Sequence, residues 1–586
     1  MRPAKQWELL APEPHRAESI SRALGISPVL AQLLVNRGLD EPDAASLFLR
    51  APLASLHDPS LLPGVDEAAR RIHAAIAAGK RICIYGDYDV DGITGTTILW
   101  RCLQLAGVAD AHRHIPHRLE EGYGLSCEAL QSLQRQGYQV IVTVDCGITS
   151  VAEAEEARRL GLELIITDHH EPREELPAAD VLVHPRLPGS RYPFPNLCGA
   201  GVAFKLAWAL SREFSQAKKV GERFQRFLLE CMALVALGTV ADVVPLLDEN
   251  RVFVRHGLKS LAEGPSIGLK ALLEVAELSD GKSLNAGHIG FNLAPRLNAA
   301  GRLGQGIMAV ELLGCLNEQR ARDLARYLNE QNEVRQKIER SILHAARTRV
   351  EAELDLDQTP ALVLDDPDWH PGVIGIVAGR LVERYARPVL LIAGQGEICQ
   401  GSGRSVPGFP LHRALAACSE HLVSHGGHAA AAGFKVRRDE VDKLRERFYA
   451  EAERLTNGRS IQPRLLIDAE VPLSALTHGL LKWIDALEPH GVGNRRPVFM
   501  TGGLQIVGEP RKVGKGELHL SFMVKQADGP RMKAIAFGMA DRLPELLAAG
   551  GKCCLAYTPK RNEWQGYVDI DLEVADLQPG PTAQLV

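Results

Sequence analysis

The sequence predicts a multidomain α/β protein: a parallel-sheet domain joined by a long helix to a second α/β domain, followed by a small closed β-barrel. Strand patterns alternate with helical patterns in residues 56–316, which is typical of a parallel sheet covered by helices, and a second α/β pattern begins near residue 360. Residues 317–355 contain few helix breakers and predict one long helix. Past residue 462 short strands separated by turns predict the barrel.

The first α/β domain follows a short N-terminal region. Residues 1–55 alternate helical patterns with loops and predict a small helical cap. In residues 56–316, apolar strands are predicted to begin at Arg81, Gln139, Leu162 and Asp180, with helices between them. Functional groups in such sheets gather beyond the carboxyl ends of the strands.

The second α/β domain, residues 356–461, is predicted to open with strands at 361–366 and 388–394 around a helix. The run Gly401-Ser402-Gly403-Arg404-Ser405 is predicted to be a loop, because glycine and serine are common in turns. Residues 462–586 are expected to form five or six strands with one helix between them, which suits a barrel of the oligonucleotide-binding (OB) kind.

Whole-chain composition excludes several classes of protein. A formal net charge of −5 argues against a chain coated in basic residues, so any contact with nucleic acid must be local. None of the eleven cysteines forms a CxxC pair, which predicts reduced thiols, a cytoplasmic location and no structural zinc. No signal peptide is visible, and the longest apolar window, Cys231–Ala241, is too short to span a bilayer.

Acidic residues and histidines follow three of the predicted strands. Asp87, Asp89 and Asp91 stand at alternate positions after the first strand, so in extended backbone their carboxylates converge and require a cation. The other members of the set are Asp145, Asp168, His169, His170 and Asp242. Carboxylates and imidazoles in this number suffice for a two-metal site, and the oxygen ligands favour Mg²⁺ or Mn²⁺.

Each of these residues also has an ordinary structural interpretation. An Asp- and Gly-rich segment is a common surface turn, and Asp145 is placed where a helix N-cap would stand. Adjacent histidines are often exposed, and Asp242 could bind backbone amides. Taken singly these interpretations are preferred; the convergence of all the residues at strand ends favours the metal site.

Four motifs then carry a resemblance. GDYDVDG, TVDCG, DHH and ADVVP, in this order, resemble those of the DHH phosphoesterase superfamily. Further stretches resemble the RecJ family of single-strand-specific DNA exonucleases over nearly the whole chain: IPHRLEEGYG, LCGAGVAFKL, APRLNAAGRLG, WHPGVIGIVAGRL, GSGRS, GGHAAAAGF and LEPHGVGNRRPVF. The resemblance implies a DHH catalytic domain at 56–316, a connecting helix at 317–355, a DHHA1 domain at 356–461 and an OB-fold-like nucleic-acid-binding domain at 462–586.

Two departures from the family pattern stand out. His490-Gly491 replaces a Phe-Gly pair that many members carry, and Tyr85 stands where pyrophosphatase relatives place a histidine ligand. The second departure is normal for RecJ-like members and leaves Asp87 as a possible substitute ligand.

The resemblance implies a role for each residue of the metal set. Asp89 and Asp91 would hold one Mn²⁺ or Mg²⁺ ion each, and Asp145 would bridge the pair. His169 and Asp242 would complete the second site, while His170 would contact the scissile phosphate. Asp168 would orient the histidines.

Substrate contacts are expected from arginines and Gly-flanked loops, because arginine binds phosphate through a planar fork. The candidates are Arg118, Tyr123, Arg296, Arg302, Ser402, Arg404 and His428. The resemblance assigns Arg302, Ser402 and Arg404 to a 5′-phosphate pocket, although a surface ion pair is the ordinary role of a single arginine. Tyr123 could stack a base or support its loop, and His428 could line the track or pack.

The barrel carries basic residues and an aromatic near its turns: Lys512, Lys515, Lys560, Arg561 and Trp564. Such residues suit single-strand binding, and solvated hairpin ends are the equally weighted alternative.

The resemblance implies a metal-dependent 5′→3′ exonuclease that hydrolyses single-stranded DNA to 5′-mononucleotides in recombination and repair. Single-strand DNA-binding protein and a RecQ-type helicase are the expected partners, with no membrane association. The alternatives are a DHH phosphodiesterase acting on short oligoribonucleotides or cyclic dinucleotides, and an inactive DHH replication scaffold. The first alternative predicts a shorter chain without a barrel, and the second predicts lost metal ligands.

Overall fold

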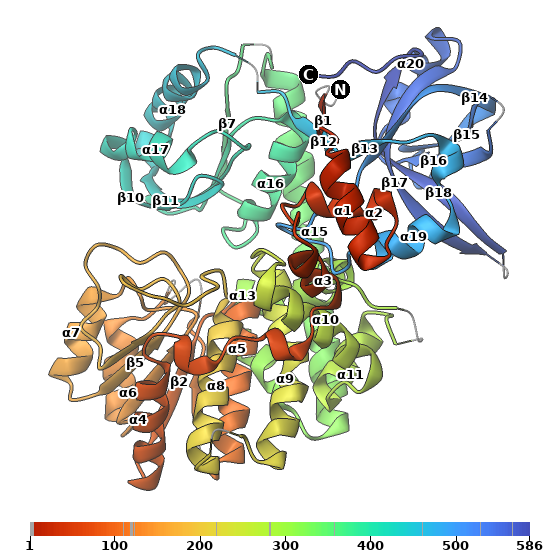
Figure 1. The fold of residues 1–586 in the computed structure, drawn as a ribbon. Helices are drawn as coiled ribbons and strands as arrows, with labels where there is room; N and C mark the ends of the chain where they lie inside the picture. The colour runs from red at the N-terminus through yellow and green to blue at the C-terminus, as the bar shows by residue number, and fades with distance from the viewer. Residues whose placement is uncertain are drawn as a thin grey trace. The chain divides into compact units, whose positions relative to one another are not determined.

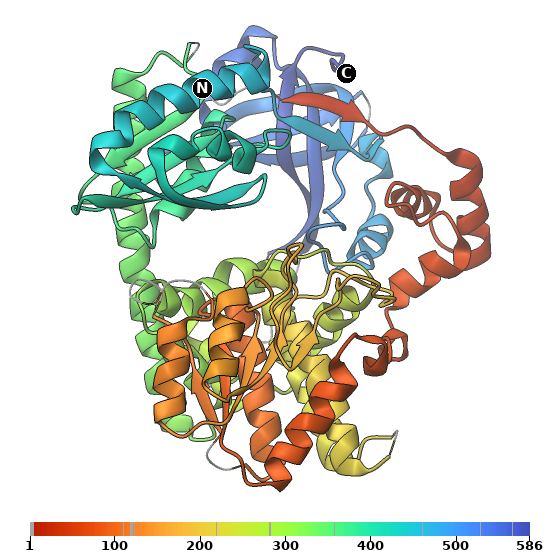
Figure 2. The ribbon, with the colours of Figure 1, turned by 90° about the vertical axis from the view of Figure 1, so that its left-hand side faces the viewer.

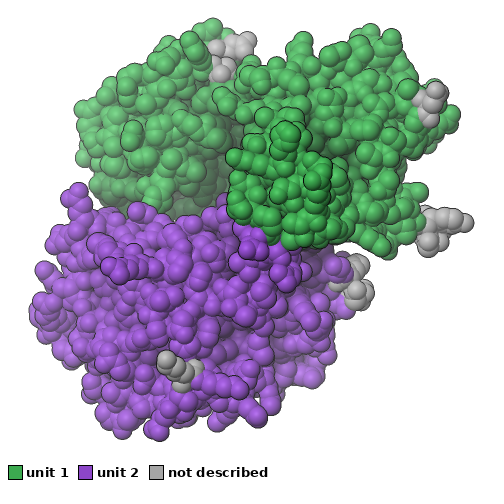
Figure 3. Space-filling view, in the orientation of Figure 1, with its two compact units in different colours: residues 1–42, 334–486, 496–586 green, residues 43–333, 487–495 purple. Residues whose placement is uncertain are grey.

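The computed structural model describes residues 5–108, 111–117, 121, 124–217, 219–279, 283–356, 358–459, 461–527, 529–564 and 567–586. Two compact units divide the chain (Figure 3). Unit 1 contains residues 1–42, 334–486 and 496–586, and unit 2 contains residues 43–333 and 487–495. Each unit is described separately below.

Unit 2 is built around a parallel sheet of five strands in the order β3-β2-β4-β5-β6. The strands are β2 (Ile82–Gly86), β3 (His112–His114), β4 (Val140–Val144), β5 (Glu163–Thr167) and β6 (Val181–Val183). The four predicted strands are confirmed. The short β3 was not predicted, because His-Arg-His lacks the apolar run of a buried strand.

Helices cover both faces of this sheet (Figures 1 and 2). One face packs against α4 (Val65–Ala77), α5 (Val90–Leu105) and α8 (Gly199–Ser215), and the other against α6 (Cys127–Arg135) and α7 (Val151–Arg159). Strands buried on both faces explain the continuous apolar runs in the sequence, since no residue of β2 or β4 faces solvent.

The rest of unit 2 is helical. It contains α9 (Glu222–Ala241), α10 (Asp248–Glu263), α11 (Ile267–Val275), α12 (Ala286–His288), the π-helical turn η3 (Ile289–Leu293), α13 (Ala294–Arg302) and α14 (Gly306–Gly314). Among the described residues, α9 alone is long and apolar enough to cross a membrane by length and composition, but 61% of its apolar window is buried inside the fold. A core helix of a globular protein has the same properties.

A buried ion pair ties α8 to α10. Lys205 and Glu249 are both fully buried and hydrogen-bonded to each other, and Lys205 Nζ also donates to the carbonyl of His57 at 2.6 Å. Glu249 accepts further hydrogen bonds from the hydroxyl of Tyr192 and the amide of His57. Every charge in the cluster is therefore compensated locally.

Lys205→Met is expected to lower the free energy of unfolding by about 3–5 kcal/mol, because it leaves the Glu249 carboxylate buried without its counter-charge. The double variant Lys205→Met/Glu249→Gln should recover part of this loss. Denaturant unfolding followed by circular dichroism measures both variants. A single variant as stable as the wild type would contradict the assignment.

The long helix α15 runs from Glu318 to Glu353, in close agreement with the prediction. The division between the two units falls within it, between residues 333 and 334.

Unit 1 contains a second five-stranded sheet in the order β10-β11-β9-β8-β7. Its strands are β7 (Leu362–Asp366), β8 (Val389–Ala393), β9 (Ile398–Arg404), β10 (Leu422–Gly427) and β11 (Ala431–Arg437), and its helices are α16 (Ile374–Tyr385), α17 (Leu411–Ala416) and α18 (Val441–Thr456). Strand β7 pairs in parallel with β8, and the remaining pairs are antiparallel.

The prediction of a loop at Gly401–Ser405 is wrong, because residues 401–404 belong to the central strand β9. The glycines allow close packing of neighbouring side chains and do not form a turn. A Cβ on Gly401 would lie 2.1 Å from the ring of Phe434, and one on Gly403 would lie 2.8 Å from Leu390. Glycine here leaves room for neighbouring side chains within a sheet.

The C-terminal part of unit 1 is the barrel. Its strands are β13 (Ala469–Glu470), β14 (Phe499–Val513), β15 (His519–Gln526), β16 (Arg531–Ala536), β17 (Lys552–Trp564) and β18 (Tyr567–Pro579), with helices α19 (His478–Asp485) and α20 (Leu543–Ala548). The preceding β12 (Arg464–Ile467) belongs to a separate two-stranded sheet. The sheet runs β13-β14-β15-β16-β18-β17, and pairing of β14 with β17 closes it. The predicted OB-like barrel is confirmed.

The N-terminal region contains the predicted helices α1 (Pro14–Leu24), α2 (Pro28–Val35) and α3 (Pro42–Arg50), but also a strand, β1 (Gln6–Leu9). Strand β1 pairs in parallel with β12, and Trp7 is fully buried, with its indole donating to Asp576 at 2.8 Å. A four-residue strand whose partner lies more than 450 positions away has no local signal.

Candidate metal centre

The loop after β2 presents the first acidic residues. Asp89 is the N-cap of α5, and its Oδ1 accepts hydrogen bonds from the amides of Asp91 at 2.9 Å and Gly92 at 3.1 Å. The N-cap role that the sequence suggested for Asp145 is thus filled at α5 by Asp89, which uses only one carboxylate oxygen for it, while Ser150 is the N-cap of the helix after Asp145. Tyr85, at the departure noted above, is buried in β2 and donates to the carbonyl of Gly124 at 3.0 Å.

Asp91 is held by the N-terminus of a second helix. Its carboxylate accepts from the amides of Gly199 at 2.5 Å and Ala200 at 2.8 Å, which begin α8. Sequence reasoning missed this support, although the run Cys198-Gly199-Ala200-Gly201 before an apolar helix was a visible signal. Helix N-termini stabilise anions, so α8 fixes the Asp91 carboxylate in place.

Asp145 follows β4 in a left-handed backbone conformation, with φ of +64°. Aspartate tolerates this conformation better than most residues. The turn places the carboxylate against Gly199, where a Cβ would come within 2.5 Å of Asp145 Oδ1. Asp145 is 1% exposed, so its position is set by the surrounding packing.

The Asp-His-His sequence after β5 is organised by Asp168. Oδ1 of Asp168 accepts from Nδ1 of His170 at 2.8 Å and from the amide of His169 at 2.7 Å, while Oδ2 accepts from the amide of Ile148 at 3.0 Å. A further contact was not predicted: His184 Nε2 bonds the carbonyl of His170 at 2.7 Å.

These segments bring the predicted metal ligands together in two groups, one formed by Asp87, Asp89 and Asp145 and the other by Asp91, His169 and Asp242, and a third group, Asp145, His169 and His170, overlaps both. Within each group the candidate ligand atoms lie within 4.8 Å of one another. Nε2 of His169 is 3.1 Å from Asp145 Oδ1 and 3.6 Å from Asp242 Oδ2. Asp145 therefore lies beside both groups, as a bridging residue would.

The donor atoms of this cluster fit divalent cations. Among the described residues, Asp145 Oδ1, Asp242 Oδ2 and both ring nitrogens of His169 are buried without a hydrogen-bond partner. Buried polar atoms are normally hydrogen-bonded, and exceptions mark a site for an ion or another ligand. Oxygen donors with one imidazole are the ligand set expected for Mn²⁺ or Mg²⁺.

Charge repulsion in the cluster shows in the carboxyl pKa values. Burial and the neighbouring Asp89 raise the pKa of Asp91 to about 6. Burial and Asp91 raise the pKa of Asp242 to about 9, and the pKa of Asp145 is raised well above its usual range for the same reasons. Without a cation the folded site disfavours the ionised carboxylates.

The two histidines differ in charge. Burial and the adjacent His170 lower the pKa of His169 to about 3, so its ring is neutral and suited to ligation. For His170, burial alone would lower the pKa, but the hydrogen bond to Asp168 and the surrounding carboxylates raise it to about 9. His170 is therefore a cation near neutral pH.

Glycine at position 238 of α9 makes room for the site, because a Cβ there would lie 2.5 Å from Asp91 Oδ1. Gly238→Ala is expected to lower Mn²⁺ affinity about 10- to 100-fold by displacing that carboxylate. Gly379→Ala in α16 is the matched control, because no atom lies within 4 Å of its Cβ; it should raise stability by about 0.5–1 kcal/mol. Manganese titration and thermal unfolding measure both, and wild-type affinity in Gly238→Ala would contradict the geometry.

The predicted substrate residues are distributed over both units. Arg118 and Tyr123 lie outside the described residues. Arg302 is the last residue of α13 in unit 2 and is half-buried. Arg296 is engaged internally: its guanidinium donates to Asn329 Oδ1 at 2.9 Å and to the carbonyl of Asn292 at 2.7 Å.

Ser402 and Arg404 lie next to each other in unit 1, with Arg404 Nη1 3.3 Å from Ser402 Oγ. Both side chains lie against the N-terminus of α16, since a Cβ on Gly375 would be 2.8 Å from Ser402 Oγ and 3.1 Å from Arg404 Nη2. His428 is exposed in the turn between β10 and β11.

The basic residues of the barrel fall into two kinds. Lys512 and Lys515 are exposed and form no ion pair with any described residue. Lys560 pairs with Glu573, and Arg561 lies 3.7 Å from Asp485. The side chain of Trp564 lies outside the described part of the structure.

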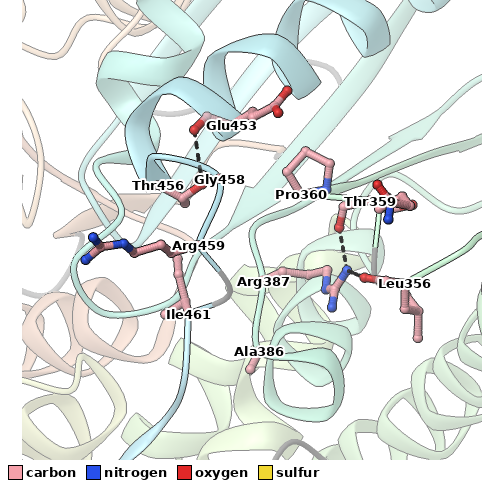
Figure 4. Close-up of a pocket in the computed structure, with 11 residues that line it drawn as sticks. Leu356, Thr359, Pro360, Ala386, Arg387, Glu453, Thr456, Gly458, Arg459 and Ile461 are labelled. Atoms are coloured by element: carbon pink, nitrogen blue, oxygen red, sulfur yellow. Dashed lines mark hydrogen bonds between the residues drawn. The ribbon is translucent and has the colours of Figure 1, made fainter.

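A separate cavity of about 210 Å³ in unit 1 is lined by residues around the end of α18 and the segment before β7 (Figure 4). Arg387 donates there to the carbonyls of Leu356 and Thr359. None of the predicted site residues lines this cavity. Because Arg387 binds backbone carbonyls, we interpret the cavity as a space left by the packing of the surrounding loops.

Comparison with known proteins agrees with this arrangement. Models of the DHH family N-terminal domain, the DHHA1 domain and the RecJ OB domain match residues 81–239, 358–454 and 467–576. The single-stranded-DNA-specific exonuclease RecJ of Bacillus subtilis is 36% identical, with 97% of this chain and 70% of the relative covered. The RecJ of Dickeya dadantii is 37% identical, with 94% and 96% covered.

The crystal structure of Thermus thermophilus RecJ in complex with Mn²⁺ superposes with a TM-score of 0.84 at 32% identity, covering 99% of this chain and 80% of that one. Motif order, domain composition and fold thus agree along the length of the sequence, and the chain belongs to the RecJ family of single-stranded-DNA-specific exonucleases.

Proposed function

We propose that the chain is a metal-dependent 5′→3′ exonuclease that hydrolyses single-stranded DNA to 5′-mononucleotides. One observation carries the proposal: two adjoining groups of buried and half-buried carboxylate and imidazole donors meet beyond the sheet, with Asp145 beside both. This is the donor arrangement of two-metal phosphoesterases. An inactive scaffold has no reason to keep buried donor atoms without partners.

Asp87, Asp89 and Asp145 would hold one divalent cation, and Asp91, His169 and Asp242 the other, with Asp145 shared. When bound, the cations would promote attack by water on phosphorus and neutralise charge on the phosphate oxygens. The amides of Gly199 and Ala200 keep the Asp91 carboxylate in one orientation, so this ligand needs no rearrangement on binding.

His170 supplies a positive charge of the protein itself. Its pKa of about 9 keeps the ring protonated near neutral pH, and Asp168 holds its Nδ1–H. We assign His170 to the scissile phosphate, whose oxygens gain charge in the transition state. Asp168 acts through the histidine by fixing the orientation of the ring, as partners of catalytic histidines do.

Ser402 and Arg404 are proposed to bind the 5′-phosphate. They adjoin the N-terminus of α16, and a helix N-terminus with an arginine fork is a favourable anion site. Arg302 is proposed as a further phosphate ligand, and His428, Arg118 and Tyr123 as contacts along the strand. Arg296 is assigned to structure instead, because its donors are used within unit 2.

We propose that successive parts of the chain have different functions. Residues 56–316 carry the catalytic site, 356–461 the 5′-end site and 462–586 the surface for longer strands, with 1–55 as a cap and 317–355 as the connecting helix. We also propose a cytoplasmic role in DNA recombination and repair, with single-strand DNA-binding protein and a RecQ-type helicase as partners.

Lys512→Ala/Lys515→Ala is expected to weaken binding of long single strands and to lower the salt slope by about 1.4, because each phosphate contact contributes about 0.7 on single strands. Lys560→Ala is the control, since Glu573 already neutralises that lysine. Binding isotherms at several salt concentrations measure the slope. An unchanged slope in the double variant would show that these lysines do not contact the phosphates of the strand.

The proposed function is tested with 5′-labelled single strands, duplexes and dinucleotides in the presence of Mn²⁺ or Mg²⁺. Degradation of single strands from the 5′ end, with duplexes resistant, is the expected result. Preference for dinucleotides would indicate the phosphodiesterase alternative, and rapid degradation of duplex would also overturn the proposal.

A further inference from the structure

Phe291 is an aromatic side chain that the fold leaves outside its core. It is 86% exposed, the highest value among the large apolar side chains of the described residues. Isolated exposed apolar residues are common, so exposure alone assigns no role. The backbone that carries Phe291 and its position in unit 2 supply the additional observations.

Phe291 lies at the centre of η3, a π-helical turn between α12 and α13. Such turns interrupt the regular helix and are frequent at functional sites. The side chain of Arg296 holds the turn against α11. Its Nη1 donates to the carbonyl of Asn292 in the turn at 2.7 Å, and its Nη2 donates to the carbonyl of Val275 in α11 at 3.4 Å. Arg296 is therefore a positioning residue for the turn.

The turn packs against the C-terminal end of α9, the helix that leads into Asp242. A Cβ on Gly290 would lie 3.7 Å from Cγ1 of Val240, two residues before Asp242. Val243, directly after Asp242, is 65% exposed and has φ of +62°, an unusual conformation for a β-branched residue. The turn that carries Phe291 thus packs against the helix whose end supplies a proposed metal ligand.

The helix that continues from the turn contacts the acidic loop itself. Asn298 Oδ1 of α13 accepts from the amide of Val90 at 3.1 Å, and Gly301 lies so close to Tyr88 that a Cβ would come within 2.1 Å of its carbonyl oxygen. The segment bearing Phe291 is thus attached at one end to α9 and at the other to the loop of Asp89 and Asp91.

We propose that Phe291 stacks against a nucleobase of the single strand as it passes the metal centre. This inference rests on the proposed function and deepens it. An exposed ring can stack on any base, because every base has a π face, so the contact gives affinity without sequence preference. A base within a duplex has both faces occupied, so the contact also favours single strands.

Three substitutions separate stacking from other roles. Phe291→Ala removes the ring, Phe291→Leu keeps an apolar side chain without a ring, and Phe291→Trp keeps a stacking surface. The alanine and leucine variants are expected to raise KM for a single-stranded oligonucleotide about 10-fold with Mn²⁺, while tryptophan stays near the wild type. Leu316→Ala, at an 83% exposed apolar residue of the same unit, should leave KM unchanged.

Strands with one abasic site at successive positions then locate the contact. The wild type should show one position at which loss of the base raises KM by a similar factor, and Phe291→Ala should be insensitive at that position. Thermal unfolding should be unchanged in every Phe291 variant, because the side chain packs against little else.

The proposal is overturned if Phe291→Ala keeps the wild-type KM. It is also overturned if Phe291→Ala raises KM but Phe291→Leu keeps the wild-type value, because an apolar contact without a ring would then suffice. Equal abasic profiles in wild type and Phe291→Ala would overturn it as well. A wild-type protein that degrades no single strand would instead refute the proposed function, so the two failures are distinguishable.

Discussion

Asp145→Ala is expected to lower the rate of single-strand degradation by at least about 10³-fold while leaving affinity for the strand within a few-fold of the wild type. Asp145 contributes a donor atom to the group of Asp87 and Asp89 and also lies against His169 of the second group. Its loss removes the shared ligand and therefore disturbs both groups at once. The proposed 5′-phosphate residues, Ser402 and Arg404, are untouched.

Asp145→Asn keeps the side-chain volume beside Gly199 and should be nearly as inactive, which separates charge from packing. Asp66→Ala, at an exposed aspartate of the same unit, is the control and should retain full activity. Initial rates with Mn²⁺ and fluorescence anisotropy with a labelled strand provide the two readouts. Near-normal turnover in either Asp145 variant would show that the ligand assignment is wrong.

Asp242→Asn is expected to make the chelated protein more thermostable than the wild type, by an amount that grows with pH and reaches on the order of 5 °C. Burial and Asp91 raise the pKa of Asp242 to about 9, against an unfolded value near 3.8. Between these values the folded protein binds more protons than the unfolded one, so stability falls as pH rises. Asparagine carries no charge, so the stability of the variant does not fall with pH at this position.

Saturating Mn²⁺ should reverse the order of the two proteins. A bound cation stabilises the ionised carboxylates of the wild type and binds the folded state selectively, whereas the variant lacks one ligand. Melting curves from pH 5 to pH 9, with chelator and with Mn²⁺, measure the difference. A stability difference that is independent of both pH and metal would show that Asp242 does not belong to a cation site.

Much of the catalytic sheet was predictable because its signals are local. Strands β2, β4 and β5 are apolar runs that end at Gly86, Val144 and Thr167, so their boundaries and their shared edge could be inferred together. The clustering of Asp145 and His169 follows from the same rule, since carboxyl ends of parallel strands lie at one edge, whereas Asp242 joins them from the C-terminal end of α9.

Other features depended on contacts between distant residues. Gly401 and Gly403 suggested a loop, but the ring of Phe434 and the side chain of Leu390 require them in a strand. Arg296 was predicted to bind phosphate, but in the structure its guanidinium donates hydrogen bonds to Asn329 and Asn292. Composition cannot distinguish a turn from close packing, or a substrate arginine from a structural one.

The sequence by itself determined the order of domains, the strands of the catalytic sheet and the identities of the metal-ligand candidates. These follow from short-range patterns of apolar and acidic residues. Only the tertiary structure decided that the amides of α8 hold Asp91, that Asp168 keeps His170 charged, and that an exposed Phe291 lies on a turn packed against the end of α9. Those properties arise from burial and from hydrogen bonds across the fold, and the energies of both depend on neighbours that sequence spacing does not specify.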